Sequence, residues 1–402
     1  MPDNKFFANH HNTWGHKWGY KDSSFVLNDD QTVSMVGDRY ELSGTRMPDF
    51  IPYIEEVLSI TLDPNDKLAE VEHKPVTPPN LNQSFMDAVK STFSEDHFSL
   101  EDEDRLIHSH GQTTSEEVYK VLYNRVARCV DLVFYVESDA EVQQLIQMAA
   151  AHDVCLVPFG GGTNVTSALM IPDAEQRMII SVDMRRMDQI EWLNEEDRRV
   201  CVQAGITGSA LESWLEDRGY CMGHEPDSVE LSTLGGWIAT NASGMKKNRY
   251  GNIEDIVENV TMISPKGSIE QVEPLSRASI GFKPQNILFG SEGNLGIITK
   301  AVLKIHKKPD VKKYNSVIFK DWESGVKFLY DLSKTNFVPS SVRLVDNMQF
   351  RFGQALKPKT EGFKAFMSKV EKFFVLKVKG FDADKMCAVS YTHLTLPTSD
   401  LV

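Results

Sequence analysis

The sequence lacks several features that would assign it to a common class of protein. None of its five cysteines forms a C-x-x-C pair, and no apolar run approaches the roughly 18 residues that a membrane span needs. Scattered cysteines in a long chain are typical of reduced, mostly buried thiols. The first twenty residues are polar and aromatic, unlike a signal peptide. Together these absences predict a soluble, non-secreted protein.

Positive charge is also scarce. The 402 residues contain 43 Lys and Arg against 57 Asp and Glu, for a formal net charge of -14. Such a balance repels phosphate backbones and anionic surfaces wherever the charge is spread evenly, so no nucleic-acid partner is expected. With 41% hydrophobic and 25% charged residues, the composition is that of a globular protein. The length predicts two or three packed units.

Common catalytic signatures are missing as well. The sequence contains no G-x-x-x-x-G-K-[ST], no G-x-G-x-x-G that opens a helix, and no G-x-S-x-G. The pair His108-x-His110 lacks further ligands at a matching spacing, so no metal site is predicted. These observations disfavour P-loop ATPases, Rossmann dehydrogenases, serine hydrolases and zinc enzymes.

The hydrophobic pattern changes along the chain. Residues 1–126 are polar and interrupted by proline, and we expect a helical N-terminal region there, with helices near Phe50–Leu58 and Phe85–Phe93. From Leu132 the pattern becomes strand, helix and strand, because Ser138 and Glu141 form a capping box between two apolar runs. This order predicts a βαβ unit.

Further strands and a second unit follow. The remaining strands are expected at Met178–Val182, Val200–Gln203, Ile256–Ile263, Ile269–Val272 and Ile297–Ile305. Pro265–Ser268 is typical of a hairpin turn and Ser209–Arg218 of a helix. Helices are too few for a doubly wound sheet, so residues 127–308 are predicted to form an α+β domain, and residues 309–390 to begin a second α+β domain.

Three glycine-rich segments could carry chemistry: Pro158–Asn164, Thr233–Gly244 and Gly290–Gly296. Glycines leave room for a ligand and let consecutive amide N–H groups converge on an anion, and a diphosphate is the natural occupant. Tight turns explain such segments equally well.

Two further features are ambiguous in the same way. Gly223–Ser228 is either a contact for a cofactor or a simple turn, and Arg343 is either a fixed cation in a pocket or a residue on a solvated strand face.

Taken together, Pro158–Asn164, Gly223–Ser228, Thr240–Asp255 and Gly290–Gly296 resemble the alkyldihydroxyacetonephosphate synthase family, the flavoenzymes of ether-lipid synthesis. The resemblance extends from Trp14–Tyr20 to Gly380–Asp382. It implies the vanillyl-alcohol-oxidase type of fold, in which a two-subdomain FAD-binding domain is joined to a cap domain. On this basis the fold class is α+β, with a helical N-terminal extension and a truncated α+β cap domain.

The resemblance also implies site residues, and FAD is the implied cofactor. It makes Arg343 a catalytic residue near the flavin, and no histidine or cysteine is marked for covalent attachment, so noncovalent FAD is expected. The implied FAD contacts are Pro158, Phe159, Gly160, Gly161, Gly162, Thr163, Asn164, Asp227, Ser228, Val229, Glu230, Leu231, Ser232, Thr233, Thr240, Asn241, Ala242, Ser243, Glu292, Gly293, Asn294, Leu295, Gly296, Ile297 and Ile298.

The family exchanges the acyl chain of acyl-dihydroxyacetone phosphate for a long-chain fatty alcohol, in the peroxisome. The resemblance is compatible with peripheral membrane association and with a homodimer. Residues 391–402 match nothing in the family and are interpreted as a non-native tail, so the cap domain is expected to be truncated and the chain inactive. No general acid or base is assigned. The alternatives are an FAD-dependent 2-hydroxy-acid dehydrogenase of the same superfamily and a non-catalytic flavin-binding remnant.

Overall fold

The structure is a computed structural model that describes residues 13–37, 39–40, 42–63, 65, 75–271, 279, 281, 283–336, 338–358, 370 and 373–395. The chain divides into two compact units. Unit 1 comprises Met1–Gly19 and Val71–Lys308, and unit 2 comprises Tyr20–Glu70 and Pro309–Val402. Each unit is described by itself below.

A four-stranded sheet forms one half of unit 1, with its strands in the order β4-β5-β7-β6. The strands are β4 (Phe98–Ser99), β5 (Leu132–Tyr135), β7 (Ile179–Asp183) and β6 (Cys155–Phe159), of which the last three are parallel. Helix α6 (Asp139–Ala151) joins β5 to β6, and Ser138 caps it by accepting a hydrogen bond from the Glu141 N–H at 3.3 Å. The expected βαβ unit is confirmed.

A five-stranded antiparallel sheet forms the other half. Its strands are β12 (Gly267–Ile269), β11 (Val257–Ser264), β13 (Ile297–Lys304), β9 (Arg199–Gln203) and β8 (Ile190–Asn194). The hairpin is confirmed, because Ser264 pairs with Gly267 across a two-residue turn. Strand β8 was not predicted, since it is a half-exposed edge strand without clear alternation.

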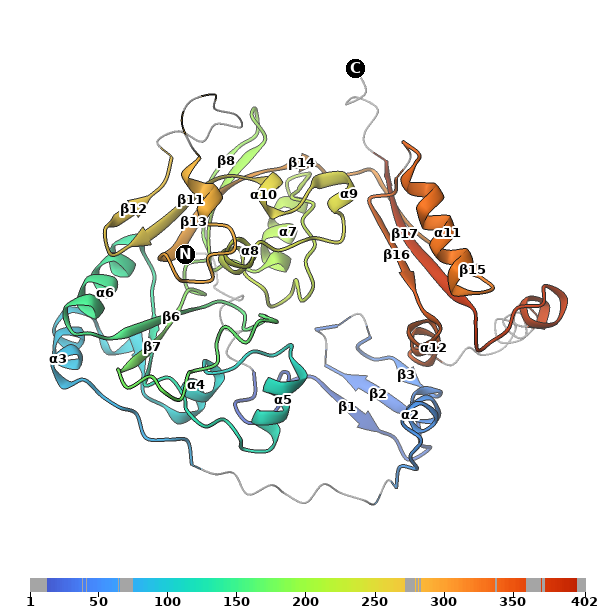
Figure 1. Ribbon diagram of the computed structural model, residues 1–402, viewed down its shortest axis with the longest axis horizontal. Coiled ribbons are helices and arrows are strands. Elements are labelled where there is room, and N and C mark those ends of the chain that lie inside the picture. Colours follow the sequence, from blue (N-terminus) through green and yellow to red (C-terminus); the bar gives the residue numbers. More distant parts are fainter. Residues whose placement is uncertain are drawn as a thin grey trace. The chain divides into compact units, whose positions relative to one another are not determined.

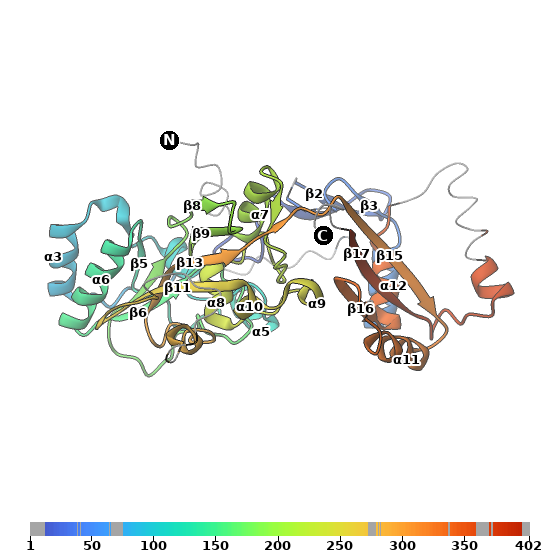
Figure 2. The ribbon, with the colours of Figure 1, turned by 90° about the horizontal axis from the view of Figure 1, so that it is seen from above.

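Short elements complete unit 1. They are α3 (Gln83–Thr92), η1 (Glu95–His97), α4 (Asp102–Ile107), α5 (Ser115–Leu122), α7 (Gly208–Glu216), β10 (Tyr220–Cys221), α8 (Leu234–Thr240), α9 (Lys247–Tyr250), α10 (Ile253–Ile256), η2 (Pro284–Ile287) and β14 (His306–Lys307). Helices α3 and α6 lie side by side against the parallel sheet (Figure 1 and Figure 2).

One apolar core connects the two sheets of unit 1. Leu145 of α6 and Phe134 of β5 belong to the same buried cluster as Ile263 of β11 and Ile297 of β13. Burial of apolar surface is the main favourable term in folding. The two halves of unit 1 are therefore held together by shared packing, which keeps the loops between them in fixed positions.

The N-terminal region differs from the expected helical extension. Helices α2 (Phe50–Leu58) and α3 occupy the two predicted helical patches, but residues 24–47 form a three-stranded sheet of β1 (Ser24–Leu27), β2 (Val33–Val36) and β3 (Arg46–Met47). The region is also shared between the units. Residues 20–70 belong to unit 2, where Phe50 packs near Phe352 and the Tyr53 hydroxyl donates to the Met348 carbonyl at 2.9 Å.

Unit 2 also contains a three-stranded antiparallel sheet in the order β15-β17-β16. The strands are β15 (Val311–Phe319), β17 (Cys387–Thr395) and β16 (Ser341–Val345). Helices α11 (Trp322–Ser333) and α12 (Asn347–Ala355) contact the sheet, and the π-helical η3 (Phe374–Val378) precedes β17 in the chain. Residues 391–395, the start of the expected non-native tail, complete the central strand, because backbone pairing does not require a particular side chain. Residues 396–402 lie outside the described residues.

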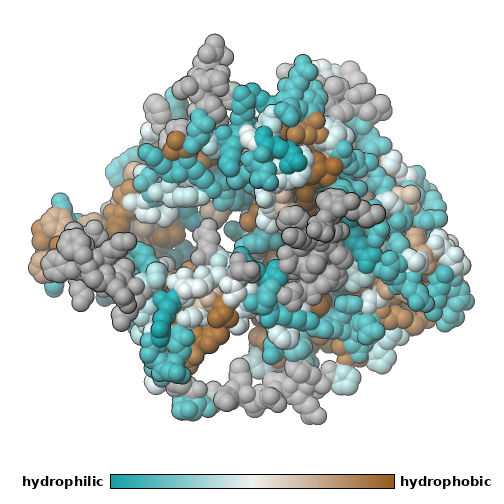
Figure 3. Space-filling view, turned by 180° about the vertical axis from the view of Figure 1, so that it is seen from behind, coloured by the Kyte–Doolittle hydropathy of each residue, from teal (hydrophilic) through white to brown (hydrophobic). Residues whose placement is uncertain are grey.

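Large apolar side chains remain exposed in unit 2. Tyr314 is 67% exposed, Tyr330 60% and Phe373 62%. The rear view of the molecule shows a mainly hydrophilic surface with separate hydrophobic patches (Figure 3). No helix among the described residues is long and apolar enough to cross a membrane.

The cysteines are all free thiols, as the sequence predicted. Four of them are buried, and Cys155 is partly buried. Burial raises the pKa of the Cys221 thiol to about 11, because a thiolate is poorly solvated there, and the nearby Glu212 adds to the effect.

Candidate functional site

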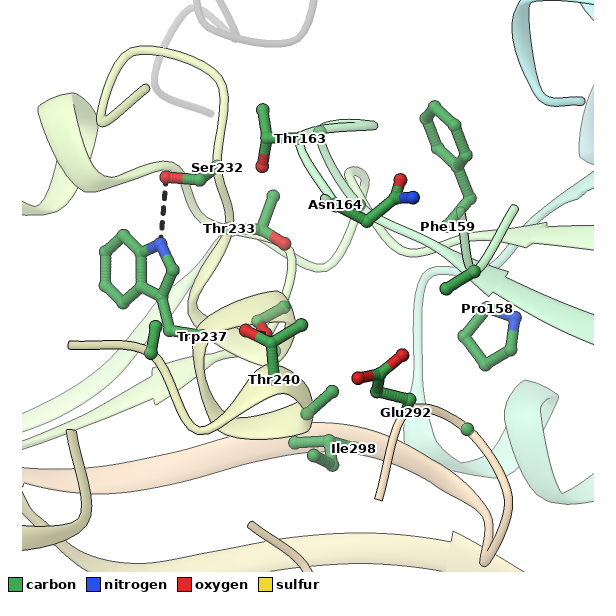
Figure 4. Close-up of a pocket in the computed structure, with 18 of the residues that line it drawn as sticks. Pro158, Phe159, Thr163, Asn164, Ser232, Thr233, Trp237, Thr240, Glu292 and Ile298 are labelled. Carbon is green, nitrogen blue, oxygen red and sulfur yellow. Dashed lines mark hydrogen bonds between the residues drawn. The ribbon is translucent and has the colours of Figure 1, made fainter. Parts of the chain in front are cut away.

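A pocket of about 450 Å³ lies between the two sheets of unit 1. Its size is typical of small-molecule sites. The walls come from the ends of β6, β7 and β9, from α8, and from the segments that precede β13 (Figure 4). All three glycine-rich segments singled out in the sequence contribute to it. The structure therefore brings together segments that are more than 130 residues apart.

The glycine loop that follows β6, residues 160–164, forms one wall of the pocket. At Gly161 a Cβ atom would lie 1.9 Å from the Leu231 carbonyl oxygen, so only glycine fits. Within the described structure, no amide N–H of residues 160–163 donates a hydrogen bond to another protein group. Backbone amides without a protein partner beside a cavity are the groups from which phosphate-binding concavities are built.

Neutral polar side chains lie on the wall that packs against the glycine loop. Trp237 and Ser232 are buried there, and the indole Nε1 donates to the Ser232 hydroxyl at 2.9 Å (Figure 4). Ser291 is also a lining residue, and its hydroxyl is buried and has no hydrogen-bond partner within the described structure. A buried polar atom without a partner is costly, so a ligand that bonds to Ser291 would be favoured.

Strained backbone conformations cluster around the pocket. Asn241 and Glu292, which line it, have φ angles of 52° and 42°, and Ser228 beside it has a φ angle of 56°. Residues other than glycine rarely adopt this left-handed region. Because such conformations persist only where the surroundings hold them, these three segments are shaped by their packing.

His224 is a buried histidine behind the pocket wall. Its ring lies edge-on to Trp237, with ring centroids 5.2 Å apart, and neither ring nitrogen has a partner within the described residues. Burial lowers the pKa of His224 to about 4, because an imidazolium would lose its hydration there. The imidazole is therefore neutral at physiological pH.

Most of the expected FAD contacts line this pocket. They are Pro158, Phe159, Gly160, Gly161, Gly162, Thr163, Asn164, Asp227, Ser232, Thr233, Thr240, Asn241, Ala242, Ser243, Glu292, Gly293, Gly296, Ile297 and Ile298. The other six, Ser228, Val229, Glu230, Leu231, Asn294 and Leu295, are not among the lining residues. Leu231 nevertheless shapes the wall, since its carbonyl packs against Gly161.

Arg343 belongs to unit 2, where it is an exposed residue of β16 and pairs with Ser390 of β17. Within the described residues, no carboxylate forms an ion pair with its guanidinium. The role expected for Arg343 stays a prediction.

Sequence reasoning missed several lining residues. Met184 and Ala204 follow the ends of β7 and β9, and Thr166 follows the first glycine loop. Only the position at a strand end could have marked Met184 and Ala204, because ligands commonly bind beyond the carboxyl ends of strands. Gly235, Gly236 and Trp237 lay within a glycine-rich segment but outside the expected contacts.

Comparisons with known proteins agree with this geometry. Residues 130–273 match a family model described as an FAD binding domain. The alkyldihydroxyacetonephosphate synthase of Caenorhabditis elegans is 40% identical over 94% of this chain and 63% of its own length. That of Dictyostelium discoideum is 31% identical over 86% of this chain and 57% of its own length.

A solved structure of an alkyldihydroxyacetonephosphate synthase matches with a TM-score of 0.84 at 29% identity, covering 96% of this chain and 68% of that one. The α+β class and its FAD-binding domain are thereby confirmed. This chain spans less than two thirds of the length of the two relatives compared by sequence.

Proposed function

We propose that this chain, a homologue of the alkyldihydroxyacetonephosphate synthases with an FAD-binding domain, binds FAD noncovalently in the pocket of unit 1. We further propose that the protein acts in ether-lipid synthesis. The reaction is the exchange of the acyl chain of acyl-dihydroxyacetone phosphate for a long-chain fatty alcohol. The bond between the dihydroxyacetone carbon and the ester oxygen breaks, and a bond from that carbon to the alcohol oxygen forms. The fatty acid leaves with both of its oxygens, and the proton lost by the alcohol balances the charge of the departing carboxylate.

The observation that carries this proposal is the glycine loop. Its four free amide N–H groups, at residues 160–163, would hold the FAD diphosphate through backbone donors. No Lys, Arg or His occurs among the described residues that line the pocket, so the backbone has to supply the positive potential. The unpartnered Ser291 hydroxyl is a further donor or acceptor for the cofactor.

The composition of the lining supports the proposal of noncovalent attachment. None of the described lining residues is a histidine or a cysteine, the types that carry covalent flavin in this kind of fold by resemblance. Flavin released from the protein by acid precipitation would support this, whereas flavin retained in the precipitate would contradict it.

Bound flavin supplies the reactive ring at which the exchange takes place, without net oxidation of the substrate. The chain itself contributes the binding wall and, by resemblance, the Arg343 guanidinium. A fixed cation beside the reacting carbon would stabilise the departing carboxylate as its charge develops.

The remaining parts of the proposal rest on the family resemblance alone. We assign the protein to the peroxisome, with acyl-dihydroxyacetone phosphate and a long-chain fatty alcohol as substrates, and with peripheral membrane association and a homodimer as its expected state. The exchange activity is proposed for the whole protein, because the chain spans 63% of the Caenorhabditis relative.

Two assays test this proposal. Equilibrium dialysis should show FAD bound in about equal molar amount to the chain, and the flavin should not be reduced by D-lactate or D-2-hydroxyglutarate without oxygen. Rapid reduction by either acid would favour the 2-hydroxy-acid dehydrogenase instead.

The second assay measures transfer of a radiolabelled fatty alcohol onto acyl-dihydroxyacetone phosphate. Where the wild type is active, Arg343→Ala should keep FAD and lose about a hundredfold or more of the rate, as for a lost charge-stabilising group. Full FAD binding with no transfer in the wild type would support the non-catalytic flavin-binding interpretation of these 402 residues.

A further inference from the structure

A completely buried carboxylate lies directly behind the glycine loop. Asp183 is the last residue of β7, and its side chain is 0% exposed. It pairs with Phe159 in the parallel ladder, and the Met184 N–H donates to the Phe159 carbonyl at 3.0 Å. This strand pairing places Asp183 beside Phe159, the residue that immediately precedes the glycine loop.

Two basic side chains surround this carboxylate. The Arg185 Nε atom lies 3.0 Å from both oxygens of Asp183, and its Nη2 atom lies 2.5 Å from Oδ2. The Nε2 atom of His108 lies 2.9 Å from the same Oδ2. On the far side of the ring, Nδ1 donates to the Asp104 carbonyl at 2.7 Å, which fixes the plane of the imidazole. His108 and Arg185 are themselves buried.

Phe159 packs on top of this triad. The centroids of the Phe159 and His108 rings are 4.4 Å apart, and the Arg185 guanidinium lies 5.1 Å from the Phe159 ring centre. Phe159 also lines the pocket. The triad therefore packs against a residue of the pocket lining.

The segment that carries His108 continues to the glycine loop itself. The Gln112 N–H donates to the Gly162 carbonyl at 2.7 Å, and the Thr113 hydroxyl donates to the Asn164 carbonyl at 2.6 Å. These bonds occupy the Gly162 and Asn164 carbonyls and tie the loop to the segment that follows His108. His108 at one end anchors this segment to Asp183, and Gln112 and Thr113 at the other end hold the loop.

We propose that Asp183, Arg185 and His108 are positioning residues that set the conformation of the glycine loop and so determine the affinity for the FAD diphosphate. This inference rests on the proposed function for its ligand. A buried ion pair is specific in geometry, because a misplaced partner would leave a charge without compensation. Outer partners of a bound group often matter nearly as much as the groups in direct contact.

The main test is Asp183→Asn, compared with Glu258→Gln as a matched control. Glu258 is also a buried carboxylate of unit 1, with its Oε2 2.6 Å from Arg199 Nε, but it is not among the lining residues. Both variants should lower the melting temperature. Only Asp183→Asn should weaken FAD binding, by about tenfold or more, the effect typical of lost outer partners.

A second measurement keeps the test independent of FAD. Hydrogen–deuterium exchange at the loop is measured at Gln112 and Met184, whose amides donate to the Gly162 and Phe159 carbonyls. In the FAD-free protein this exchange should accelerate in Asp183→Asn and remain at the wild-type rate in Glu258→Gln. If the wild type binds no FAD, the proposed function fails, and the exchange rates alone decide whether the triad positions the loop.

Two further variants apply if Asp183→Asn does not fold. Arg185→Lys keeps the charge and should bind FAD more tightly than Arg185→Met, which removes it. A folded Asp183→Asn or Arg185→Met variant with wild-type FAD affinity and wild-type loop exchange would overturn the proposal. Equal weakening of FAD binding in Glu258→Gln would also overturn it, because the effect would then be one of general stability.

Discussion

The Thr166 hydroxyl donates a 3.0 Å hydrogen bond to Oε2 of Glu292, although the two residues are 126 positions apart in the sequence. Thr166 follows the glycine loop, and Glu292 precedes β13, so this bond joins two walls of the pocket.

Removing that bond should loosen the pocket. We expect Thr166→Val to weaken FAD binding by about fivefold, because an exposed hydrogen bond contributes about 1 kcal/mol. Thr166→Ser keeps the hydroxyl and should restore most of the affinity. Fluorescence titration with FAD measures both. Equal affinity in the valine and serine variants would show that the bond does not contribute.

Gly161 has no space for a side chain. In Gly161→Ala the new Cβ would lie 1.9 Å from a backbone oxygen, so the loop would have to move, at a cost of about 1–3 kcal/mol or more. We expect lower thermal stability and loss of FAD binding.

Gly353→Ala is the matched control for this change. Gly353 lies in α12, and a Cβ atom added there would have no neighbouring atom within 4 Å, so alanine should stabilise the protein by about 0.5–1 kcal/mol. Thermal melts measure both changes. Wild-type stability and FAD affinity in Gly161→Ala would contradict the close packing of the loop.

Stability should fall in mild acid. The pKa of His224 is lowered from 6.5 to about 4 by burial, so the unfolded state binds a proton that the folded state rejects between these values. The free energy of unfolding should therefore decrease as the pH falls from 6.5 towards 4, by about 3 kcal/mol from this group. Burial also lowers the pKa of His110 and of His306, so these two groups should add to the loss of stability in acid.

Urea denaturation at several pH values tests this expectation. His224→Gln should have a shallower decline between pH 6.5 and 4 than the wild type, because glutamine does not titrate. Parallel curves for the two proteins would show that His224 is protonated equally in both states.

The thiols should react slowly in the folded protein. Burial raises the pKa of Cys201 to about 12, with a further contribution from Glu191, and only the thiolate is nucleophilic. Ellman's reagent at pH 8 should therefore modify the thiols slowly before denaturation and all five after it. Rapid reaction of Cys201 in the folded protein would contradict its burial.

Most of the local elements in the FAD-binding part of the chain could be predicted from the sequence. The Ser138 cap, the apolar runs of β5 and β6, and the hairpin at Pro265 depend on neighbouring residues, whose periodicity and turn chemistry are visible in the chain. The strands at residues 24–47 were missed because they are short and partly exposed, so their hydrophobic pattern is weak.

The candidate site was foreseen only in part. Glycine-rich loops could be recognised as anion-binding segments, and the family resemblance connected them to FAD. Asp183 could not be recognised, since an aspartate after an apolar strand is typical of an ordinary turn. Its contact with His108 spans 75 positions, and its burial depends on packing that no local pattern records.

By itself, the sequence determined the βαβ unit, the turn chemistry of three glycine-rich loops and the family to which those loops are similar. Local steric and hydrogen-bonding preferences decide such features. Only the tertiary structure decided that the three loops share one pocket and that His108 and Arg185 meet at Asp183. It also decided that the amides of residues 160–163 find no acceptor among the residues that the structure describes. These relationships arise from long-range packing, in which segments far apart in the chain compensate one another's buried charges and hydrogen bonds.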